Sequence, residues 1–99
     1  MIETISVSDL HEQLKKDEEI FLLDVREPHE FTAFNIQGYL IPLAELLERL
    51  NEIPKDKPIV VYCRSGQRSD VAGQLLKSQG YHDVKNLAGG MLAWQEAFS

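Results

Sequence analysis

The chain has 99 residues, with sixteen acidic and ten basic side chains, a formal net charge of −6 and 43% hydrophobic residues. This length predicts one domain with a single core over residues 1–99, and the composition is typical of a globular protein. The acidic balance argues against nucleic acid as the main partner, because contacts to phosphates need a basic face.

The sequence predicts a cytoplasmic protein without a membrane segment. The first residues, Met1-Ile2-Glu3-Thr4, lack the basic region and apolar core of a signal peptide, and no apolar run approaches the ~20 residues that cross a bilayer. The single cysteine excludes an intramolecular disulfide and any C-x-x-C redox or zinc pair. His11 and His29 are expected at the surface, and His82 lies in a polar turn without an evident role, so no metal is predicted. The motif G-x-G-x-x-G is absent, and no cofactor is predicted.

The first half of the chain predicts strands and helices in alternation. A short edge strand is expected over residues 3–6, followed by a helix over residues 9–16 with Ser8 as its N-cap. A buried strand is expected over residues 20–23, and Pro28 suits the first turn of a short helix.

The second half continues this alternation. A brief strand over residues 38–42 is followed by a core-facing helix with leucines at the spacing of an amphipathic helix: Leu43, Leu46, Leu47 and Leu50. A last strand is expected over residues 83–87. The paired glycines Gly89 and Gly90 predict a sharp turn that lets the backbone pass closely beneath the loop after Cys63, before a closing helix.

The central stretch combines a buried strand with a cysteine at its carboxyl end. Residues 59–62 are apolar, Cys63 follows them, and a short turn with Gly66 leads into a helix over residues 69–79, which Gly80 ends as a left-handed C-cap. With its neighbours, this stretch predicts a three-layer α/β fold: a central five-stranded parallel sheet with helices on both faces. Ligands bind such sheets at the carboxyl ends of the strands.

The turn after Cys63 is suited to hold an anion. N–H groups at a helix start lack partners, so those of residues 64–69 can converge beside the sulfur if the loop curls. The cations Arg64 and Arg68 lie in the same loop. Such surroundings lower a cysteine pKa from ~8.5 to roughly 3.5–7.5, which predicts a thiolate that reacts with anionic, thiophilic substrates. The alternative is a buried, inert cysteine with arginines that face water.

Two charged residues, Asp24 and Arg26, end the other buried strand. Such residues are costly unless paired, and strand ends of a parallel sheet meet at one edge, so we expect both next to the Cys63 loop. There Asp24 and Arg26 would both support the loop and fix its shape, with the Asp24 carboxylate accepting loop N–H groups or pairing with Arg68. Direct catalysis by Asp24 is not expected, because a carboxylate would raise the pKa of a nearby thiol. The alternative is an exposed turn before Pro28.

Three segments closely match one protein family. They are Leu22-Leu23-Asp24-Val25-Arg26-Glu27 with Glu30-Phe31, then Ile59-Val60-Val61-Tyr62-Cys63-Arg64-Ser65-Gly66-Gln67-Arg68-Ser69, and Gly80-Tyr81 with Asn86-Leu87-Ala88-Gly89-Gly90-Met91-Leu92-Ala93-Trp94. With them the chain resembles a rhodanese domain from end to end. The family often reads Gly-His-Ile-Pro-Gly-Ala where this chain reads Phe34-Asn35-Ile36-Gln37-Gly38-Tyr39, so the family's histidine and proline at the pocket rim do not carry over.

The resemblance implies sulfurtransfer by a nucleophilic cysteine. The Cys63 thiolate would take the outer sulfur of thiosulfate or of a persulfide, and would pass it to cyanide, to a cellular thiol or to a protein acceptor. The loop would bind the sulfur anion through its amides, a role that falls on Arg64, Ser65, Gly66, Gln67 and Arg68.

Two other functions remain as alternatives at this point. A Cdc25-like phosphatase shares the fold, but it needs one residue more between cysteine and arginine than the four that separate Cys63 from Arg68. A non-catalytic rhodanese-like domain would use the same fold for protein binding or regulation. The intact cysteine loop counts against that reading.

Overall fold

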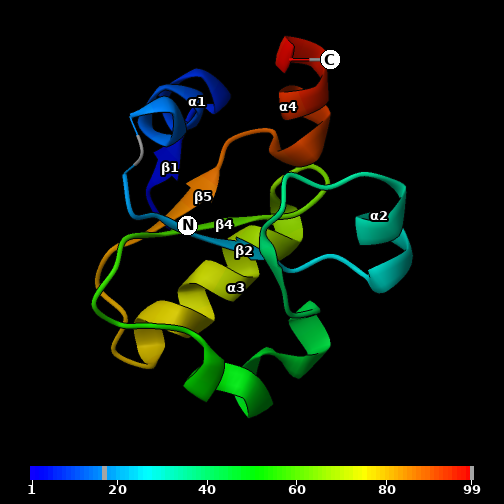
Figure 1. Cartoon of the computed structure of the whole chain (residues 1–99). Helices are drawn as coiled ribbons and strands as arrows, with labels where there is room; N and C mark the ends of the chain where they lie inside the picture. Colours follow the sequence, from blue (N-terminus) through cyan, green and yellow to red (C-terminus); the bar gives the residue numbers. More distant parts are fainter. Residues whose placement is uncertain (17, 99) are drawn as a thin grey trace.

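The computed structural model describes residues 1–16 and 18–98, with five strands in one parallel sheet. The strands pair in the order β1-β5-β4-β2-β3, so that β4 lies at the centre (Figure 1). Their bounds are β1 Thr4–Ile5, β2 Phe21–Asp24, β3 Tyr39–Leu40, β4 Ile59–Tyr62 and β5 Val84–Leu87. The predicted five-stranded parallel sheet is confirmed.

Helices cover both faces of this sheet, which confirms the three predicted layers. They are α1 Val7–Lys15, α2 Pro28–Ala33, the 3-10 helix η1 Leu43–Glu52, α3 Gln67–Ser78 and α4 Gly90–Phe98. Helices α1 and α4 lie on one face, and α3 and η1 lie on the other (Figure 1). Strand β4 is buried throughout because alternate residues enter two cores: Val60 and Tyr62 pack with Leu10 of α1, whereas Ile59 and Val61 pack towards α3.

Helix α1 begins earlier than predicted, because Ser6 rather than Ser8 is its N-cap. Ser6 has the extended backbone that an N-cap requires, and its Oγ accepts a hydrogen bond from the N–H of Asp9 at 3.0 Å. Ser8 lies inside the first turn of the helix. The turn from β1 into α1 is therefore immediate.

The leucine-rich segment is a 3-10 helix and not the predicted amphipathic α-helix. Three residues per turn place Leu43 and Leu46 on one line, and Leu46 is fully buried. Leu47 falls off that line and is 54% exposed, so its predicted place in the core is wrong. The helix is interrupted at Arg49, whose backbone is not helical, and Leu50 packs against the core beyond this kink.

His11 does not lie in open solvent as expected from the sequence. Its ring stacks on Phe98 with centroids 4.2 Å apart and meets the edge of Trp94 at 5.9 Å, because α1 packs beside α4. His29 is exposed, as predicted, and His82, in its polar turn, is exposed as well. Within the described residues, no helix combines the length and the apolar character that crossing a membrane requires.

The turn before α4 brings the backbone against the loop that follows β4. Gly89 and Gly90 both have positive φ, at 76° and 57°. The N–H groups of Met91 and Leu92 donate to the carbonyl oxygens of Cys63 at 2.9 Å and Arg64 at 3.0 Å. A side chain on Gly90 would overlap these same two carbonyls, so the predicted close approach is confirmed.

Gly90→Ala should therefore destabilise the protein more than Gly80→Ala. Gly80, at the end of α3, also has positive φ, at 90°, but a methyl there would meet only the flexible end of Lys55. Both variants incur the cost of a left-handed backbone, about 1 kcal/mol, whereas overlap with fixed backbone adds about 1–3 kcal/mol at position 90. Denaturant unfolding measures both losses, and equal losses would contradict a tight contact between α4 and the loop.

Candidate functional site

Cys63 lies at the carboxyl end of β4 with its sulfur enclosed by the loop that follows. The residue is 1% exposed. Its Sγ accepts hydrogen bonds from the N–H groups of Gly66 at 3.1 Å and Ser69 at 3.4 Å. Of the six N–H groups expected to converge here, those of Arg64, Gln67 and Arg68 make no hydrogen bond to the sulfur. The loop thus curls around the thiol itself.

The sulfur takes the part of an N-cap for α3. Gly66 is the N-cap residue, with φ 109° and ψ −8°, and it has no side chain that could accept from the first turn. Cys63 Sγ accepts the N–H of Ser69 instead, three residues after the cap. The helix starts at Gln67, two residues before the predicted start, because the glycine turn is tight. A negative sulfur at this position is favoured by the helix dipole.

Hydrogen bonds lower the pKa of the Cys63 thiol. Burial raises this pKa, but the Ser69 hydroxyl and the N–H groups of Ser69, Gly66 and Ser65 outweigh burial, and the net pKa lies below the usual value. The guanidinium groups of Arg64 and Arg68 were predicted to lower this pKa as well. Their part is smaller than expected, because Arg64 is exposed and Arg68 is bound to a carboxylate on another helix.

A buried network behind the loop links Ser69 to Asn86 of β5. Ser69 Oγ lies 3.3 Å from Cys63 Sγ and 2.6 Å from Asn86 Oδ1, and Asn86 Nδ2 donates to the carbonyl of Gly66 at 3.0 Å. Ser69 is fully buried and Asn86 is 6% exposed. No role was predicted for Asn86. The available signal is its place two residues after Val84, on the same buried face of β5, since buried polar groups need partners.

Arg68 pairs with Glu30 and not with Asp24, so the predicted Asp24–Arg68 pair is wrong. Its two terminal nitrogens donate to the two Glu30 oxygens at 2.8 and 2.9 Å. Glu30 comes from α2, which reaches this edge of the sheet. The hydrogen bonds from Arg68 are the main reason why the pKa of the Glu30 carboxyl falls to about 2, although burial raises this pKa. This forked ion pair joins the start of α3 to α2.

Asp24 pairs with Arg26, two residues further along. Arg26 donates to Asp24 through Nε at 3.0 Å and through its terminal nitrogen at 2.8 Å, and it also donates to the carbonyls of Glu30 at 3.3 Å and Phe34 at 2.7 Å. Asp24 therefore accepts no N–H group of the Cys63 loop, contrary to the prediction, because the chain's own arginine folds back over it. Both side chains are buried, which also excludes the exposed turn. Loss of either partner would cost about 3–5 kcal/mol.

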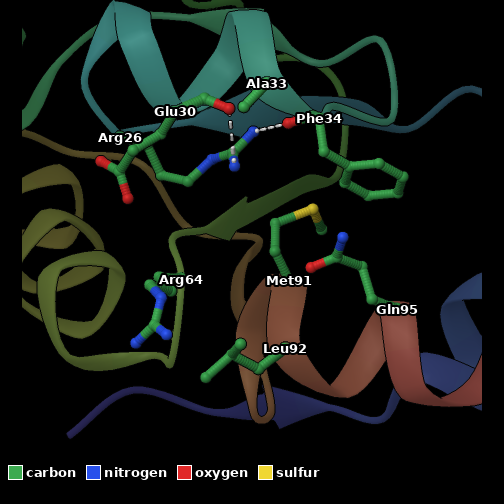
Figure 2. Close-up of a pocket in the computed structure, with 8 residues that line it drawn as sticks. All are labelled: Arg26, Glu30, Ala33, Phe34, Arg64, Met91, Leu92 and Gln95. Atoms are coloured by element: carbon green, nitrogen blue, oxygen red, sulfur yellow. Dashed lines mark hydrogen bonds between the residues drawn. The ribbon is translucent and has the colours of Figure 1, made fainter.

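A cavity of about 220 Å³ opens beside the Cys63 loop at this edge (Figure 2). Its walls come from the end of β2, α2, the Cys63 loop and α4, with these residues: Arg26, Glu30, Ala33, Phe34, Arg64, Met91, Leu92 and Gln95. Arg64 adjoins Cys63 and is exposed, whereas the Cys63 side chain itself does not line the cavity. The cavity can hold a small anion, since a liquid water molecule takes about 30 Å³.

The segment that departs from the family pattern forms part of this wall. Phe34 lines the cavity together with Met91 (Figure 2), and both belong to the apolar cluster that contains Tyr62. Asn35 fixes the chain that follows: its Nδ2 donates to the Phe31 carbonyl at 3.0 Å, and its Oδ1 accepts from the N–H of Gln37 at 2.8 Å. This turn holds Gln37 at φ 65°. The segment is thus built from an asparagine turn and an aromatic ring.

Glu30→Gln should lower the stability of the protein in a pH-dependent way. Because the pKa of Glu30 is depressed to about 2 by Arg68, the stabilisation is fully present above the unfolded-state value of ~4.3 and is lost as the pH falls towards 2. At neutral pH we expect a loss of about 1–2 kcal/mol, which should shrink over that acid range. Glu48→Gln, at an exposed glutamate of η1, is the control. A loss that stays constant down to pH 2 would contradict the ion pair.

Comparisons with known proteins agree with this geometry. The sequence matches the family described as Rhodanese-like domain over residues 6–97. It is 40% identical to a sulfurtransferase of Allochromatium vinosum, an alignment that covers 95% of this chain and 89% of that protein. It is also 40% identical to the putative sulfurtransferase YtwF of Bacillus subtilis, over 95% of this chain and 91% of that protein.

A solved structure shows the same fold. The rhodanese-related protein of Thermoplasma volcanium superposes with a TM-score of 0.88 at 32% identity, covering 98% of this chain and 94% of that one. The family match extends over nearly the whole chain, and the relatives align along nearly their whole length. The chain therefore belongs to the rhodanese-like domain family.

Proposed function

We propose that this chain is a sulfurtransferase that carries sulfur as a persulfide on Cys63. One observation carries the proposal: the Cys63 sulfur accepts N–H groups from a curled loop at the start of α3, and its pKa is lowered. A thiolate held in this way is a ready nucleophile at neutral pH. The two sulfurtransferase relatives are consistent with this chemistry.

The first half of the reaction loads the cysteine. The Cys63 thiolate attacks the outer sulfur of thiosulfate, or the outer sulfur of a persulfide. The new Sγ–S bond forms as the old S–S bond breaks, and sulfite or a thiolate leaves with the electron pair of that bond. One negative charge then rests on the outer sulfur of Cys63, so the total charge is unchanged and no oxidant is needed.

The second half returns the enzyme to its starting state. Cyanide or a thiolate attacks the outer sulfur, the Sγ–S bond breaks, and the Cys63 thiolate leaves with the electron pair. When cyanide is the acceptor, the product is thiocyanate. When a thiol of a small molecule or of a protein is the acceptor, the product is a new persulfide. The two halves form a ping-pong cycle with one covalent intermediate.

The loop has N–H groups left for the outer sulfur. Gln67 and Arg68 occupy the first two positions of α3, where an N–H has no partner in the helix, and neither N–H makes a hydrogen bond elsewhere among the described residues. The persulfide charge would develop at this helix end, where the dipole favours an anion. Gln67 and Arg68 thus complete the binding role of Arg64, Ser65 and Gly66.

The placement of Arg68 favours sulfur over phosphate chemistry. A phosphatase loop needs its arginine turned inward, with both guanidinium nitrogens on the phosphate. Here both terminal nitrogens of Arg68 are engaged by Glu30. Arg64 is the cation that meets solvent at the cavity, and we propose that it attracts an anionic donor into that space.

Cys63→Ser should abolish sulfur loading while the protein stays folded. The serine hydroxyl can still accept from the loop, but it is not ionised near neutral pH and does not attack a sulfane sulfur. Mass spectrometry after incubation with thiosulfate should show one added sulfur atom on the wild type and none on the variant. Loading of the wild type should persist below the usual thiol pKa. Hydrolysis of p-nitrophenyl phosphate without thiocyanate formation would overturn the proposal.

Arg64→Ala should raise the KM for thiosulfate roughly fivefold, equivalent to about 1 kcal/mol for an exposed charge, and should leave kcat nearly unchanged. The effect should diminish with added salt, because exposed charges are screened. Lys57→Ala removes an equal charge before the amino end of β4, at the opposite edge of the sheet, and serves as the control. An equal rise in KM for both variants would mean that only net charge matters.

A further inference from the structure

The buried Ser69–Asn86 pair has a fixed direction of hydrogen bonding. Asn86 Nδ2 donates to the carbonyl of Gly66, which can only accept, and this sets the orientation of the amide. Asn86 Oδ1 therefore faces Ser69 Oγ at 2.6 Å and must accept the hydroxyl hydrogen of Ser69. The Ser69 hydroxyl has only this one hydrogen to give.

This direction determines what Cys63 can do at its 3.3 Å contact with Ser69. While the Ser69 hydrogen points at Asn86, Ser69 Oγ offers only lone pairs to the sulfur, and Cys63 must be a thiol that donates. A thiolate would face those lone pairs. The hydroxyl must then rotate so that its hydrogen points at Sγ, and Asn86 Oδ1 loses its donor.

We propose that Ser69 and Asn86 form a hydrogen-bond switch, in which the Ser69 hydroxyl donates to Sγ only while Cys63 is an unloaded thiolate and donates to Asn86 otherwise. The persulfide state, which rests on the function proposed above, places the charge on the outer sulfur and leaves Sγ neutral. The hydroxyl can then return to Asn86. Ser69 thus favours the reactive thiolate, and Asn86 favours the thiol and the loaded enzyme.

The surroundings of the sulfur allow this switch to be isolated. Arg68 is close enough to Cys63 for an electrostatic interaction, and none of the variants proposed below changes Arg68 or its partner Glu30. Arg64 is exposed to solvent. Cys63 is the only cysteine, so a thiol titration by ultraviolet thiolate absorbance, or by the pH dependence of alkylation, reports on this one group without any turnover.

Ser69→Ala should raise the Cys63 pKa by about one unit, because a hydrogen bond to a charged acceptor is roughly twice as strong as one to the neutral amide that competes for it. Ser69→Thr and Ser69→Val form a second, matched pair. Both add the same bulk to the buried site, and only threonine keeps the hydroxyl, so the pKa of the valine variant should be higher than that of the threonine variant by a similar amount. No difference within either pair would overturn the switch.

Asn86→Leu tests whether Asn86 acts through Ser69. The substitution keeps the shape of the side chain, frees the Ser69 hydroxyl and removes the bond to Gly66. In the Ser69→Ala background only the loss of the Gly66 bond remains. Asn86→Leu shifts the Cys63 pKa in both backgrounds. We expect this shift to lie about one unit lower in the wild-type background than in the Ser69→Ala background. Equal changes in the two backgrounds would show a merely structural role for Asn86 and overturn the switch.

Single-turnover kinetics separate this inference from the proposed function. In Ser69→Ala, the pH profile of sulfur loading from thiosulfate should move with the thiol pKa, and the profile of discharge to cyanide should not, because Sγ does not titrate in the persulfide. A discharge profile that moves equally would overturn the switch in the loaded state. An absence of sulfur loading in the wild type would overturn the persulfide function. The titrations of the Cys63 thiol would still show whether the Ser69 hydroxyl changes its hydrogen-bond partner when the thiol ionises.

Discussion

The hydrogen bonds from loop N–H groups to the Cys63 sulfur organise the carboxyl edge of the sheet. They require the peptide groups after β4 to turn inward, which Gly66 permits with its left-handed backbone. The carbonyls of Cys63 and Arg64 face the other way, and they accept from the first turn of α4. The N–H groups of the loop thus bind the Cys63 sulfur, and its carbonyls bind the first turn of α4. The Cys63 side chain is the one loop side chain that these contacts use.

Charged side chains support this arrangement from one side only. Asp24 and Arg26 form a buried pair. Arg26 also donates to the carbonyls of Glu30, within α2, and of Phe34, which directly follows α2. Glu30 then holds Arg68 at the start of α3. The buried pair does not touch the sulfur. It fixes α2, so that the Glu30 carboxylate stands where Arg68 needs it, which is how a costly buried ion pair contributes to the site.

Much of the fold could be predicted from sequence because its signals are local. The apolar run before Cys63 and the glycine turns at positions 80 and 89–90 each determine their own conformation, and the parallel sheet follows from the alternation of strands and helices. The 3-10 form of η1 was not predictable in this way, since leucine spacing alone fits an α-helix. The N-cap of α1 was mispredicted for a similar reason: strand β1 ends at Ile5, so Ser6 and not Ser8 is the residue that caps the helix.

The site was less predictable because its partners depend on tertiary placement. Cys63 and its loop are contiguous in the sequence, so the position of the cysteine at the end of a strand could be predicted. The partner of Arg68 was not: Asp24 and Glu30 are both acidic and close in sequence, and only the packing of α2 shows which one reaches it. Asn86 lies far from Ser69 in sequence, and their contact exists because β5 pairs with β4.

The fixed N–H groups of the Cys63 loop and the rotatable hydroxyl of Ser69 together suit the persulfide chemistry proposed for Cys63. In the proposed loading of Cys63, the negative charge would move outward by one S–S bond, about 2 Å. Main-chain N–H groups cannot follow it, so the loop must offer separate donors: Gly66 and Ser69 at Sγ, and the unused N–H groups of Gln67 and Arg68 at the helix start. The hydroxyl of Ser69 can reorient, and Asn86 gives it a second acceptor within the protein. In the proposed cycle, the buried network would therefore follow the position of the charge while the backbone stays in place.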